Sequence, residues 1–460
     1  MPTSEVVRTI TDTASVWGAR LSAGTRLRRY GSVPRDLVLE ASRGEAVALA
    51  PNLGAAGALI VLPRNCINLA LPSGLVPDKA QCFIELLDRH GRPPVVVVQQ
   101  VRPPRQSKYA RKSYTLLRLG VGRRVRRWVA GACRSKDIAM ALDHTNEGPW
   151  NDVMDIVAPR AVLGINLDEE LCRSARARGI PAVELQHGMI GPWFRQRMEA
   201  RPATDRPSHM LTWDREYNQV VEPVGVVAVS TGYPALPGLT APPSPLAHVG
   251  IQAPRANAGH PTLLVTLQYR FPNAVDPLGM ISSEIGQALQ AIRESGLLLG
   301  FRFRIHPTFE QEWGATGAKR WLEANFPNCE VSVPSNSYIL NDIMRSNVVL
   351  THHSSTVFEA AILGRPSIVV SNGITMNAQG VDIGLEPEDG ALTSNDQGVV
   401  VAGFHQDIPR GIESAGLITV TRARSVPEVL RDQLNSAFLP YRPVIDATQE
   451  EALWNLGLLP

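Results

Sequence analysis

The sequence contains few cysteines, few aromatic residues and no long apolar runs. Five cysteines occur in 460 residues, and aromatic residues make up 6%. The cysteines are odd in number and scattered without a C-x-x-C pair, which argues against a disulfide scaffold and a cysteine zinc site. No apolar stretch approaches the roughly 20 residues needed to span a bilayer, and the N-terminus lacks a signal-peptide pattern. We therefore expect a cytoplasmic protein.

The usual nucleotide and metal motifs are also absent from the sequence. It has no G-x-G-x-x-G, P-loop or H-E-x-x-H motif, and no Asp-x-Asp triplet follows an expected strand. We therefore expect no bound metal and no cofactor. A net charge of +3 says little about partners, and 44% hydrophobic with 19% charged residues is ordinary for a globular chain. The length predicts about two domains.

One segment, residues 102–136, is strongly basic and contains no acidic residue. Such a block, here interleaved with aromatic and aliphatic side chains, is typical of a surface that meets anionic membrane headgroups or another polyanion. The alternative is a solvated basic loop. No recognised nucleic-acid-binding module accompanies it, so we expect an anionic membrane surface as partner and no nucleic acid. Its twelve basic residues are Arg102, Arg105, Lys108, Arg111, Lys112, Arg118, Arg123, Arg124, Arg126, Arg127, Arg134 and Lys136.

A proline- and glycine-rich stretch, residues 232–261, divides the chain into two halves of similar size. It holds seven prolines and four glycines, a composition typical of a linker. We expect an N-terminal Rossmann-like domain over 1–240, a linker over 241–261 and a C-terminal Rossmann-like domain over 262–430. Residues 431–460 should form a helical segment that packs back on the N-terminal domain.

Both halves alternate between apolar β-branched runs and helical patterns. This alternation predicts an α/β fold with two parallel, doubly wound sheets that face each other across a cleft. Asn166 is expected to cap a helix that ends at Gly179. The expected strands are 58–62, 94–99, 161–166, 182–187, 209–213 and 226–230, then 262–269, 301–305, 329–333, 348–352, 367–371 and 417–421; helices are expected over 278–295, 308–325, 336–346 and 356–363.

The stretch "LTHHSSTVFEAAILGRPSIVV" places small polar residues in the turn between a strand and a helix. Ligands bind at the carboxyl ends of parallel strands, and the start of a helix attracts anions. Ser354, Ser355 and Thr356 are therefore expected to bind a phosphate. The alternative is helix capping, because Thr356 and Glu359 have the spacing of a capping box. That box leaves Ser354 and Ser355 unexplained.

Two histidines follow other expected strands. In "FRFRIHPTFE", His306 and Pro307 stand where a strand ends and a helix begins. A histidine there can donate to a phosphate, or stabilise a leaving phosphate as imidazolium. In "AVELQHG", Gln186, His187 and Gly188 follow a strand of the other half, where a histidine can act as general base for an acceptor hydroxyl. The alternative for His306 is a loop histidine without a role, and the alternative for His187 is a histidine hydrogen-bonded within its domain.

The order of these motifs, from "AVLGIN" and "AVELQHG" to "FRIHP" and "LTHHSSTVFEAAILGRPSIVV", resembles bacterial GT-B glycosyltransferases of surface-polysaccharide assembly. The resemblance covers about residues 160 to 372. It is closest to the polysialyltransferase, Kdo-transferase and CDP-glycerol glycerophosphotransferase group. It implies an acceptor-side N-terminal domain and a nucleotide-sugar-binding C-terminal domain. It also implies that His306, Ser354 and Ser355 hold the phosphate of a cytidine nucleotide and that Glu359 reaches the ribose.

The resemblance leaves two candidates for the base. His187-Gly188 matches the histidine-glycine motif of the glycerophosphotransferases. The sialyl- and Kdo-type enzymes use a carboxylate in an acid-acid-glycine motif, which Asn146-Glu147-Gly148 matches only in part. Asp168, Glu169 and Glu170 lack the glycine and suit the first turn of a helix, and "EPEDG" over 386–390 lies in the wrong half. Arg270 or Arg304 would help His306 to neutralise the leaving group.

The sequence thus predicts a metal-independent glycosyltransferase that moves a sugar from a nucleotide-activated donor to a growing cell-surface glycan. The resemblance places it at the inner face of the plasma membrane, with a glycan or glycolipid acceptor. Three alternatives stay open: a CDP-polyol phosphotransferase, a nucleotide-sugar 2-epimerase, and a non-catalytic nucleotide-binding subunit of a capsule assembly complex.

Overall fold

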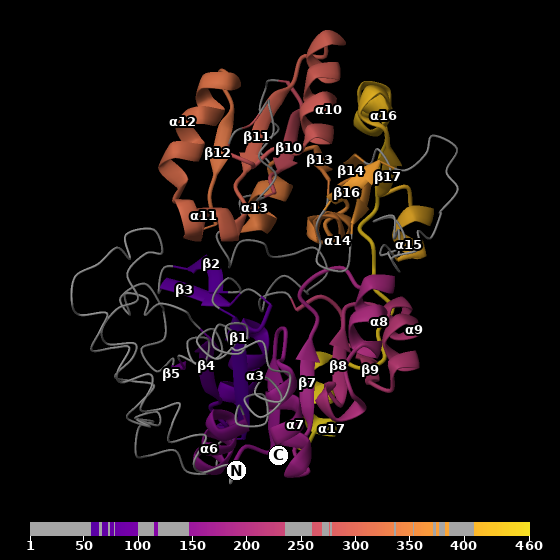
Figure 1. Cartoon of the computed structure of the whole chain (residues 1–460). Coiled ribbons are helices and arrows are strands. Elements are labelled where there is room, and N and C mark those ends of the chain that lie inside the picture. Colours follow the sequence, from indigo (N-terminus) through magenta and orange to yellow (C-terminus); the bar gives the residue numbers. More distant parts are fainter. Residues whose placement is uncertain are drawn as a thin grey trace, which may run out of the picture.

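The computed structural model describes residues 57–63, 67–71, 74–77, 79–99, 115–117, 147–234, 260–268, 276, 278–334, 337–352, 354–370, 374–376, 382–385 and 409–460. These residues form two α/β domains, one above the other in Figure 1. The basic segment 102–136 lies outside the described residues except for one short strand. Arg270, His353 and the "EPEDG" stretch lie outside them too. No helix in the described ranges is long and apolar enough to cross a bilayer.

The N-terminal domain contains a seven-stranded parallel sheet in the order β5-β4-β1-β6-β7-β8-β9. Its strands are β1 (Ala58–Pro63), β4 (Val95–Gln99), β5 (Thr115–Leu117), β6 (Ala161–Gly164), β7 (Ala182–Leu185), β8 (His209–Thr212) and β9 (Val227–Ser230). A hairpin of β2 (Ile67–Leu71) and β3 (Gly74–Pro77) follows β1. The helices are α3 (Gln81–Arg89), α6 (Glu147–Val157), α7 (Glu169–Ala177), α8 (Pro192–Glu199) and α9 (Arg215–Val221).

The C-terminal domain contains a six-stranded parallel sheet in the order β12-β11-β10-β13-β14-β17. Its strands are β10 (Thr262–Thr266), β11 (Gly300–Arg304), β12 (Glu330–Ser332), β13 (Val348–Thr351), β14 (Ser367–Val370) and β17 (Ile418–Thr421), with β15 (Ile374–Met376) and β16 (Asp382–Leu385) as a separate pair. The helices are α10 (Ser283–Glu294), α11 (Pro307–Trp313), α12 (Ala315–Asn325), α13 (Ile339–Met344), α14 (Thr356–Ile362), α15 (Arg410–Ser414) and α16 (Val426–Leu434).

Both parallel sheets agree with the prediction of a doubly wound α/β fold, and each expected strand is present with ends shifted by one to three residues. Two local predictions were wrong. The expected helix over 308–325 is split into α11 and α12 at Gly314, whose φ of 79° interrupts the helix. Asn166 does not cap α7; it lies in the left-handed region with φ 53°, and Asp168 caps the helix through Leu171 N–H.

The C-terminal segment returns to the first domain. After α16 the chain runs down to the lower domain in Figure 1 and ends in α17 (Gln449–Asn455). Leu453, Leu458 and Leu459 are buried in the same apolar cluster as Ile60 on β1. Residues 431–460 therefore run from the C-terminal domain back to the N-terminal domain, where their apolar side chains are buried in its core.

An apolar interface also joins the two domains directly. Trp213 and Tyr233 of the N-terminal domain lie in one buried cluster with Phe358 of α14. The ring centroids of Trp213 and Phe358 are 5.3 Å apart, and those of Trp213 and Tyr233 are 5.0 Å apart. These are distances at which aromatic rings attract each other. The carboxyl ends of β8 and β9 are thus held against the start of α14.

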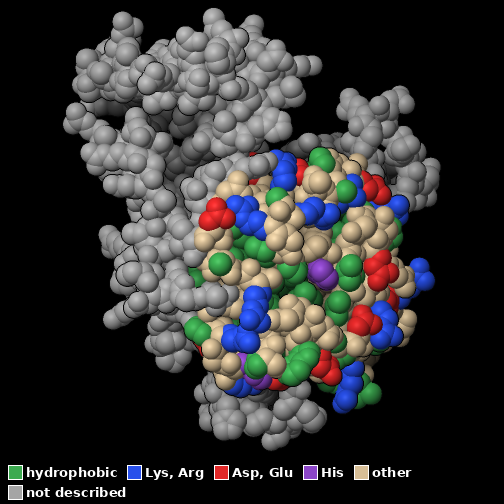
Figure 2. Space-filling model, turned by 90° about the horizontal axis from the view of Figure 1, so that it is seen from below, with side chains coloured by type: hydrophobic (Ala, Val, Ile, Leu, Met, Phe, Trp, Pro, Cys, Tyr) green, Lys and Arg blue, Asp and Glu red, His purple; other side chains and the backbone are tan. Residues whose placement is uncertain are grey.

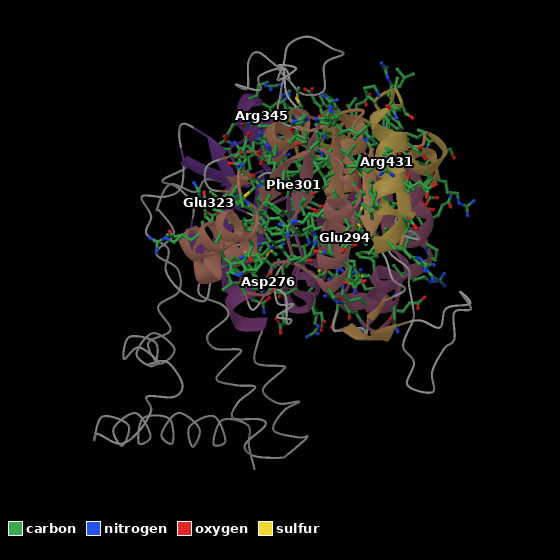
Figure 3. All side chains as sticks on the ribbon, turned by 90° about the horizontal axis from the view of Figure 1, so that it is seen from above. Asp276, Glu294, Phe301, Glu323, Arg345 and Arg431 are labelled. Carbon is green, nitrogen blue, oxygen red and sulfur yellow. The ribbon has the colours of Figure 1, made fainter. Side chains whose placement is uncertain are left out.

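Charged side chains are spread over the outer faces of both domains. Figure 2 shows basic and acidic side chains interspersed, with apolar ones between, on the described part of the N-terminal face seen from below. In the view from above in Figure 3, Phe301 of β11 lies near the centre of the C-terminal domain, with Arg345 and Arg431 on different sides. Neither view places the described charges of one sign in a single patch.

Candidate functional site

The donor-side candidates of the C-terminal domain follow two strands of one parallel sheet. His306 and Pro307 follow β11, and Ser354, Ser355 and Thr356 follow β13. Only β10 lies between β11 and β13 in the strand order. Because all three strands run in the same direction, both groups stand at the same edge of the sheet. In Figure 1 the starts of α11 and α14 lie on the side of the upper domain that faces the lower one.

His306 is fixed by the helix that follows it. It is the N-cap of α11, with Pro307 in the first turn, and its Nδ1 accepts a hydrogen bond of 3.1 Å from Thr308 N–H. Burial lowers the pKa of His306 to about 4. The ring is therefore neutral at pH 7, and since Nδ1 accepts, Nε2 carries the proton. The expected imidazolium is corrected accordingly: His306 can donate one hydrogen bond, without a positive charge.

The hydroxyl groups after β13 are arranged differently from a capping box. Ser355, not Thr356, precedes the first residue of α14, and its side chain makes no capping bond. Ser354 Oγ accepts from Thr356 N–H at 3.2 Å and lies 2.7 Å from Thr356 Oγ1. Thr356 is buried, whereas Ser354 and Ser355 are partly exposed. The capping-box alternative for Thr356 and Glu359 was therefore wrong, and two hydroxyl groups reach the surface of this turn.

Glu359 instead binds across the domain interface. It is 3% exposed, and its Oε1 accepts from Lys79 Nζ and from the hydroxyl of Tyr233. Lys79 also donates to the Tyr233 hydroxyl. The sequence analysis missed Lys79 and Tyr233, which lie in a turn before α3 and at the start of the proline-rich stretch. No local pattern marks either residue, because their partner stands in the other domain.

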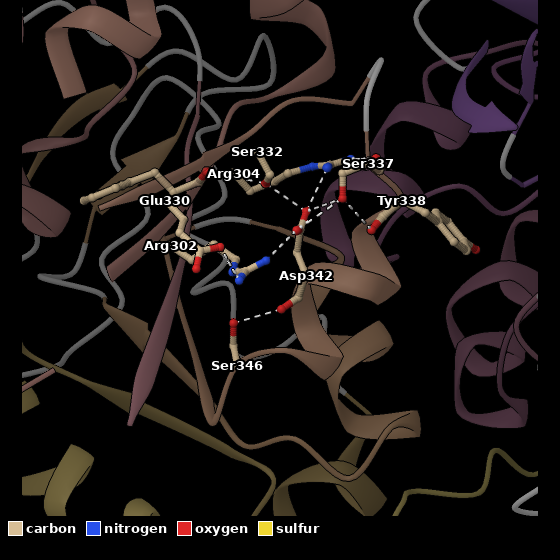
Figure 4. A network of polar contacts seen from close by, with 9 residues as sticks. Arg302, Arg304, Glu330, Ser332, Ser337, Tyr338, Asp342 and Ser346 are labelled. Atoms are coloured by element: carbon tan, nitrogen blue, oxygen red, sulfur yellow. Dashed lines mark hydrogen bonds and ion pairs between the residues drawn. The ribbon is translucent and has the colours of Figure 1, made fainter. Parts of the chain in front are cut away.

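Arg304, expected to help neutralise the leaving group, belongs to a buried polar network instead. Its guanidinium donates to Asp342 Oδ2 at 2.8 Å and to the carbonyl of Ser337 at 2.9 Å. Arg302, two residues earlier on the same face of β11, lies 3.3 Å from Asp342 Oδ1, and Ser332 donates to Asp342 Oδ2 at 2.8 Å (Figure 4). Arg304 is thus held by α13 and the turn before it rather than offered to a ligand.

On the N-terminal side, Gln186 shapes the loop that carries His187. Gln186 is 1% exposed; its Oε1 accepts from Trp213 N–H at 2.7 Å and its Nε2 donates to the Gly188 carbonyl at 2.8 Å. Its own carbonyl accepts from Trp213 Nε1 at 3.1 Å. The Gln186 side chain and Gly188 therefore stabilise the turn after β7. Their place on the acceptor side stays a prediction.

His187 is partly exposed and lies beside the left-handed Asn166. Nε2 of His187 is 3.5 Å from Asn166 Nδ2. The buried carboxylate of Glu184 holds the Asn166 turn, accepting from the N–H groups of Asn166 and Leu167 at 2.7 and 2.9 Å. Burial, and then the charges of Arg197 and Lys79, lower the pKa of His187 to about 4. The ring is therefore neutral at pH 7.

The alternative base, Glu147, is the first residue of α6, away from any strand end. The conformation of its side chain lies outside the described part of the structure. Asp168 caps α7 and accepts from Trp150 Nε1 at 3.1 Å, so its carboxylate has a structural role, as expected. Within the described ranges, no three His, Cys, Asp or Glu side chains gather where they could hold a metal ion.

Comparison with known proteins shows a likeness of structure without one of sequence. No protein-family model matches the chain, and no curated protein matches it. The solved UDP-GlcNAc 2-epimerase from Methanocaldococcus jannaschii, in complex with UDP-GlcNAc and UDP, superposes with a TM-score of 0.52 at 13% identity, covering 87% of this chain and 98% of that one.

Two further solved structures are similar over most of their length. The wall teichoic acid polymerase TagF has a TM-score of 0.43 at 9% identity, covering 98% of this chain and 96% of that chain. Acinetobacter baumannii MurG has a TM-score of 0.46 at 10% identity, covering 86% and 99%. Together with the two parallel sheets and the returning C-terminal segment, the likeness to the epimerase shows that this chain has the GT-B fold.

Proposed function

We propose that this protein is a metal-independent glycosyltransferase that uses a nucleotide-activated sugar, with a cytidine nucleotide as the carrier, to extend a cell-surface glycan. One observation supports this most. A hydrogen-bond donor, His306 Nε2–H, and the hydroxyl groups of Ser354 and Ser355 stand at one edge of a parallel sheet, on the side that faces the other domain. Such a set of hydrogen-bond donors suits a phosphate.

His187 is the proposed base. It follows the carboxyl end of β7, is neutral at pH 7 and is partly exposed, so an acceptor hydroxyl can reach it. With a pKa of about 4 it is a weak base in the free protein. A phosphate bound nearby would offset the charges of Arg197 and Lys79 and raise this pKa toward the value at which general-base catalysis is efficient.

Binding of the nucleotide tests the donor side. We expect CMP or CDP to stabilise the protein more than UDP or GDP in thermal shift, where a ligand at 100 times its Kd adds about 2.7 kcal/mol. Replacing Ser354 and Ser355 together by alanine should weaken this binding, whereas Ser436→Ala, at an exposed position after α16, is the matched control. Unchanged nucleotide affinity in a folded double variant would remove the phosphate assignment.

The base is tested by kcat once donor and acceptor are known. A positioned base contributes about 10² to 10⁴-fold in rate, so His187→Ala should lose about that factor in kcat with little change in donor KM. Glu147→Gln is the matched comparison at the other candidate position. A large loss of kcat in Glu147→Gln alone would transfer the role to the carboxylate.

A nucleotide-sugar 2-epimerase is a second candidate, because the structure that superposes with a TM-score of 0.52 is such an enzyme. The two activities differ in what they need: an epimerase converts the nucleotide sugar without an acceptor, whereas a transferase releases the nucleotide only when an acceptor is present. A CDP-polyol phosphotransferase would release CMP rather than CDP from a CDP-linked donor. Analysis of the nucleotide products with and without acceptor therefore separates the three.

The basic segment 102–136 is proposed to hold the protein at an anionic membrane surface. The twelve basic residues without one acid support this. Contacts of this kind are screened within about 8 Å at physiological ionic strength, so binding to anionic vesicles should fall steeply with added salt. Equal binding to neutral and anionic vesicles would contradict it.

A further inference from the structure

Lys79 connects the two sides of the proposed site. It precedes α3 in the N-terminal domain and is 5% exposed. Its Nζ forms an ion pair with Glu359 on α14 of the C-terminal domain. Since α14 begins directly after Ser354 and Ser355, the ammonium reaches from one domain to the helix that carries the donor-side hydroxyl groups.

Aromatic rings hold the ammonium in place. Nζ lies 4.2 Å from the ring centroid of Tyr233 and 5.3 Å from that of Trp213. Both rings follow the carboxyl ends of neighbouring strands, β9 and β8, at the edge that also carries His187 after β7. Cation–π contacts with desolvated rings stabilise a buried cation. The ammonium of Lys79 therefore has specific contacts within the domain interface.

Lys79 also acts on the proposed base. Its positive charge is one of the causes that lower the pKa of His187, after burial and Arg197. The ammonium thus acts on the charge state of His187 while it is paired with Glu359 on α14. In the proposed transfer the sugar passes from a phosphate at the start of α14 to an acceptor at His187.

We propose that Lys79 is a further active-site residue, which leaves Glu359 for the phosphate of the bound nucleotide and stabilises the leaving group. This rests on the proposed glycosyl transfer. In that step the acceptor oxygen bonds to the anomeric carbon and its proton passes to the base. The bond from the anomeric carbon to the phosphate oxygen breaks, and both electrons stay on that oxygen. A positioned cation stabilises the negative charge that appears there.

The contacts of Glu359 allow this exchange. The Tyr233 hydroxyl donates to the same Oε1 that accepts from Lys79. When Lys79 moves to a phosphate, Glu359 keeps this donor, so its carboxylate is not left without a hydrogen bond. In the absence of nucleotide the ion pair compensates the buried ammonium, which would otherwise be costly in a desolvated place. Glu359 thus binds Lys79 in the free protein, and a phosphate with more negative charge would replace it as the partner of Lys79.

Calorimetric binding of inorganic pyrophosphate and CDP to four full-length proteins tests this inference: wild type, Lys79→Gln, Glu359→Gln and the double variant. Pyrophosphate lacks ribose, so any contact of Glu359 with the sugar does not affect the result. We expect Lys79→Gln to weaken both ligands by about tenfold or more, the loss typical of one hydrogen bond to a charged group. Glu359→Gln should bind pyrophosphate at least as tightly as wild type, because Lys79 is released.

The double variant keeps the test independent of folding, since it replaces both charges by amides of similar size and leaves no lone buried charge. It should bind as weakly as Lys79→Gln. If wild type binds pyrophosphate or CDP and the Lys79→Gln and double variants bind equally well, this inference is overturned while the proposed function stands. If Glu359→Gln weakens pyrophosphate as much as Lys79→Gln does, the pair is only structural. If wild type binds none of CMP, CDP, UDP and pyrophosphate, the proposed function is contradicted, and the inference that rests on it is contradicted with it.

Discussion

The free energy of unfolding of this protein should begin to fall at a pH well above that at which its carboxylates are protonated. Protonation of His352 should account for part of this loss. His352 directly follows β13 and is 2% exposed. Burial lowers its pKa from 6.5 to about 4. Between these two values the unfolded chain binds a proton that the folded protein does not. The contribution of His352 to stability is therefore complete above about pH 6.5 and is lost as the pH falls toward 4.

The size of this effect follows from the two pKa values. Linkage gives a loss of about 2 kcal/mol at pH 5 and well under about 1 kcal/mol at pH 7 for one such histidine. His187 and His306 have similarly lowered pKa values but are partly exposed, so each should contribute less. Because domains are stable by only about 5 to 15 kcal/mol, acidification from pH 7 to 5 should remove a large part of the total.

Urea unfolding at pH 7 and pH 5 measures this share. Between these pH values the free energy of unfolding of His352→Gln should fall by about 2 kcal/mol less than that of wild type, whatever the substitution costs at pH 7. His260→Gln, at an exposed position before β10, is the matched control and should keep the wild-type pH dependence. Identical pH dependence in wild type and His352→Gln would refute the reasoning.

Three further outcomes follow from other contacts. Asp342→Asn should cost about 3–5 kcal/mol in urea unfolding, because it leaves the buried Arg304 without its counter-ion; a loss under about 1 kcal/mol would contradict the network. Gly164→Ala should cost about 1–3 kcal/mol, since its Cβ would stand 2.4 Å from the Val61 carbonyl oxygen, and an unchanged Tm would be contrary to this. If His187 is the base, kcat/KM should stay constant from neutral pH to about pH 4 and decrease at lower pH, because the ring is then protonated; a decrease that already begins near pH 6.5 would contradict the lowered pKa of His187.

The positions of the strands could be predicted because their signals are local, whereas their order in each sheet was not predicted. Runs such as 58–62 and 368–370 consist of apolar residues buried on both faces, which is what a central parallel strand requires. The expected site residues that follow β7, β11 and β13 share this advantage. A residue at the carboxyl end of a parallel strand stands at the ligand-binding edge whatever the rest of the chain does.

The electrostatic state of the same residues could not be predicted, because it depends on contacts between distant segments. Thr356 and Glu359 have the spacing of a capping box, yet Glu359 binds Lys79, which lies 280 residues earlier in the chain. His187 and His306 directly follow strands, where the sequence gives no sign of a shifted pKa, yet burial lowers the pKa of each to about 4. Arg304 lies near the end of an expected strand, where a ligand contact is expected, but its side chain forms an ion pair with Asp342.

These contacts share one property that bears on how the site works. Two described cations on the donor side are compensated within the protein: Lys79 by Glu359, and Arg304 by Asp342. The Arg304 pair lies within one domain and is bonded from several sides, so a ligand would gain little by breaking it. The Lys79 pair instead links two domains, and its acceptor retains Tyr233 when it breaks. A phosphate that recruits a cation from inside this protein should therefore recruit Lys79, and in doing so it alters a contact that holds the domains together. Nucleotide binding and the relative position of the domains are then coupled through this one ion pair.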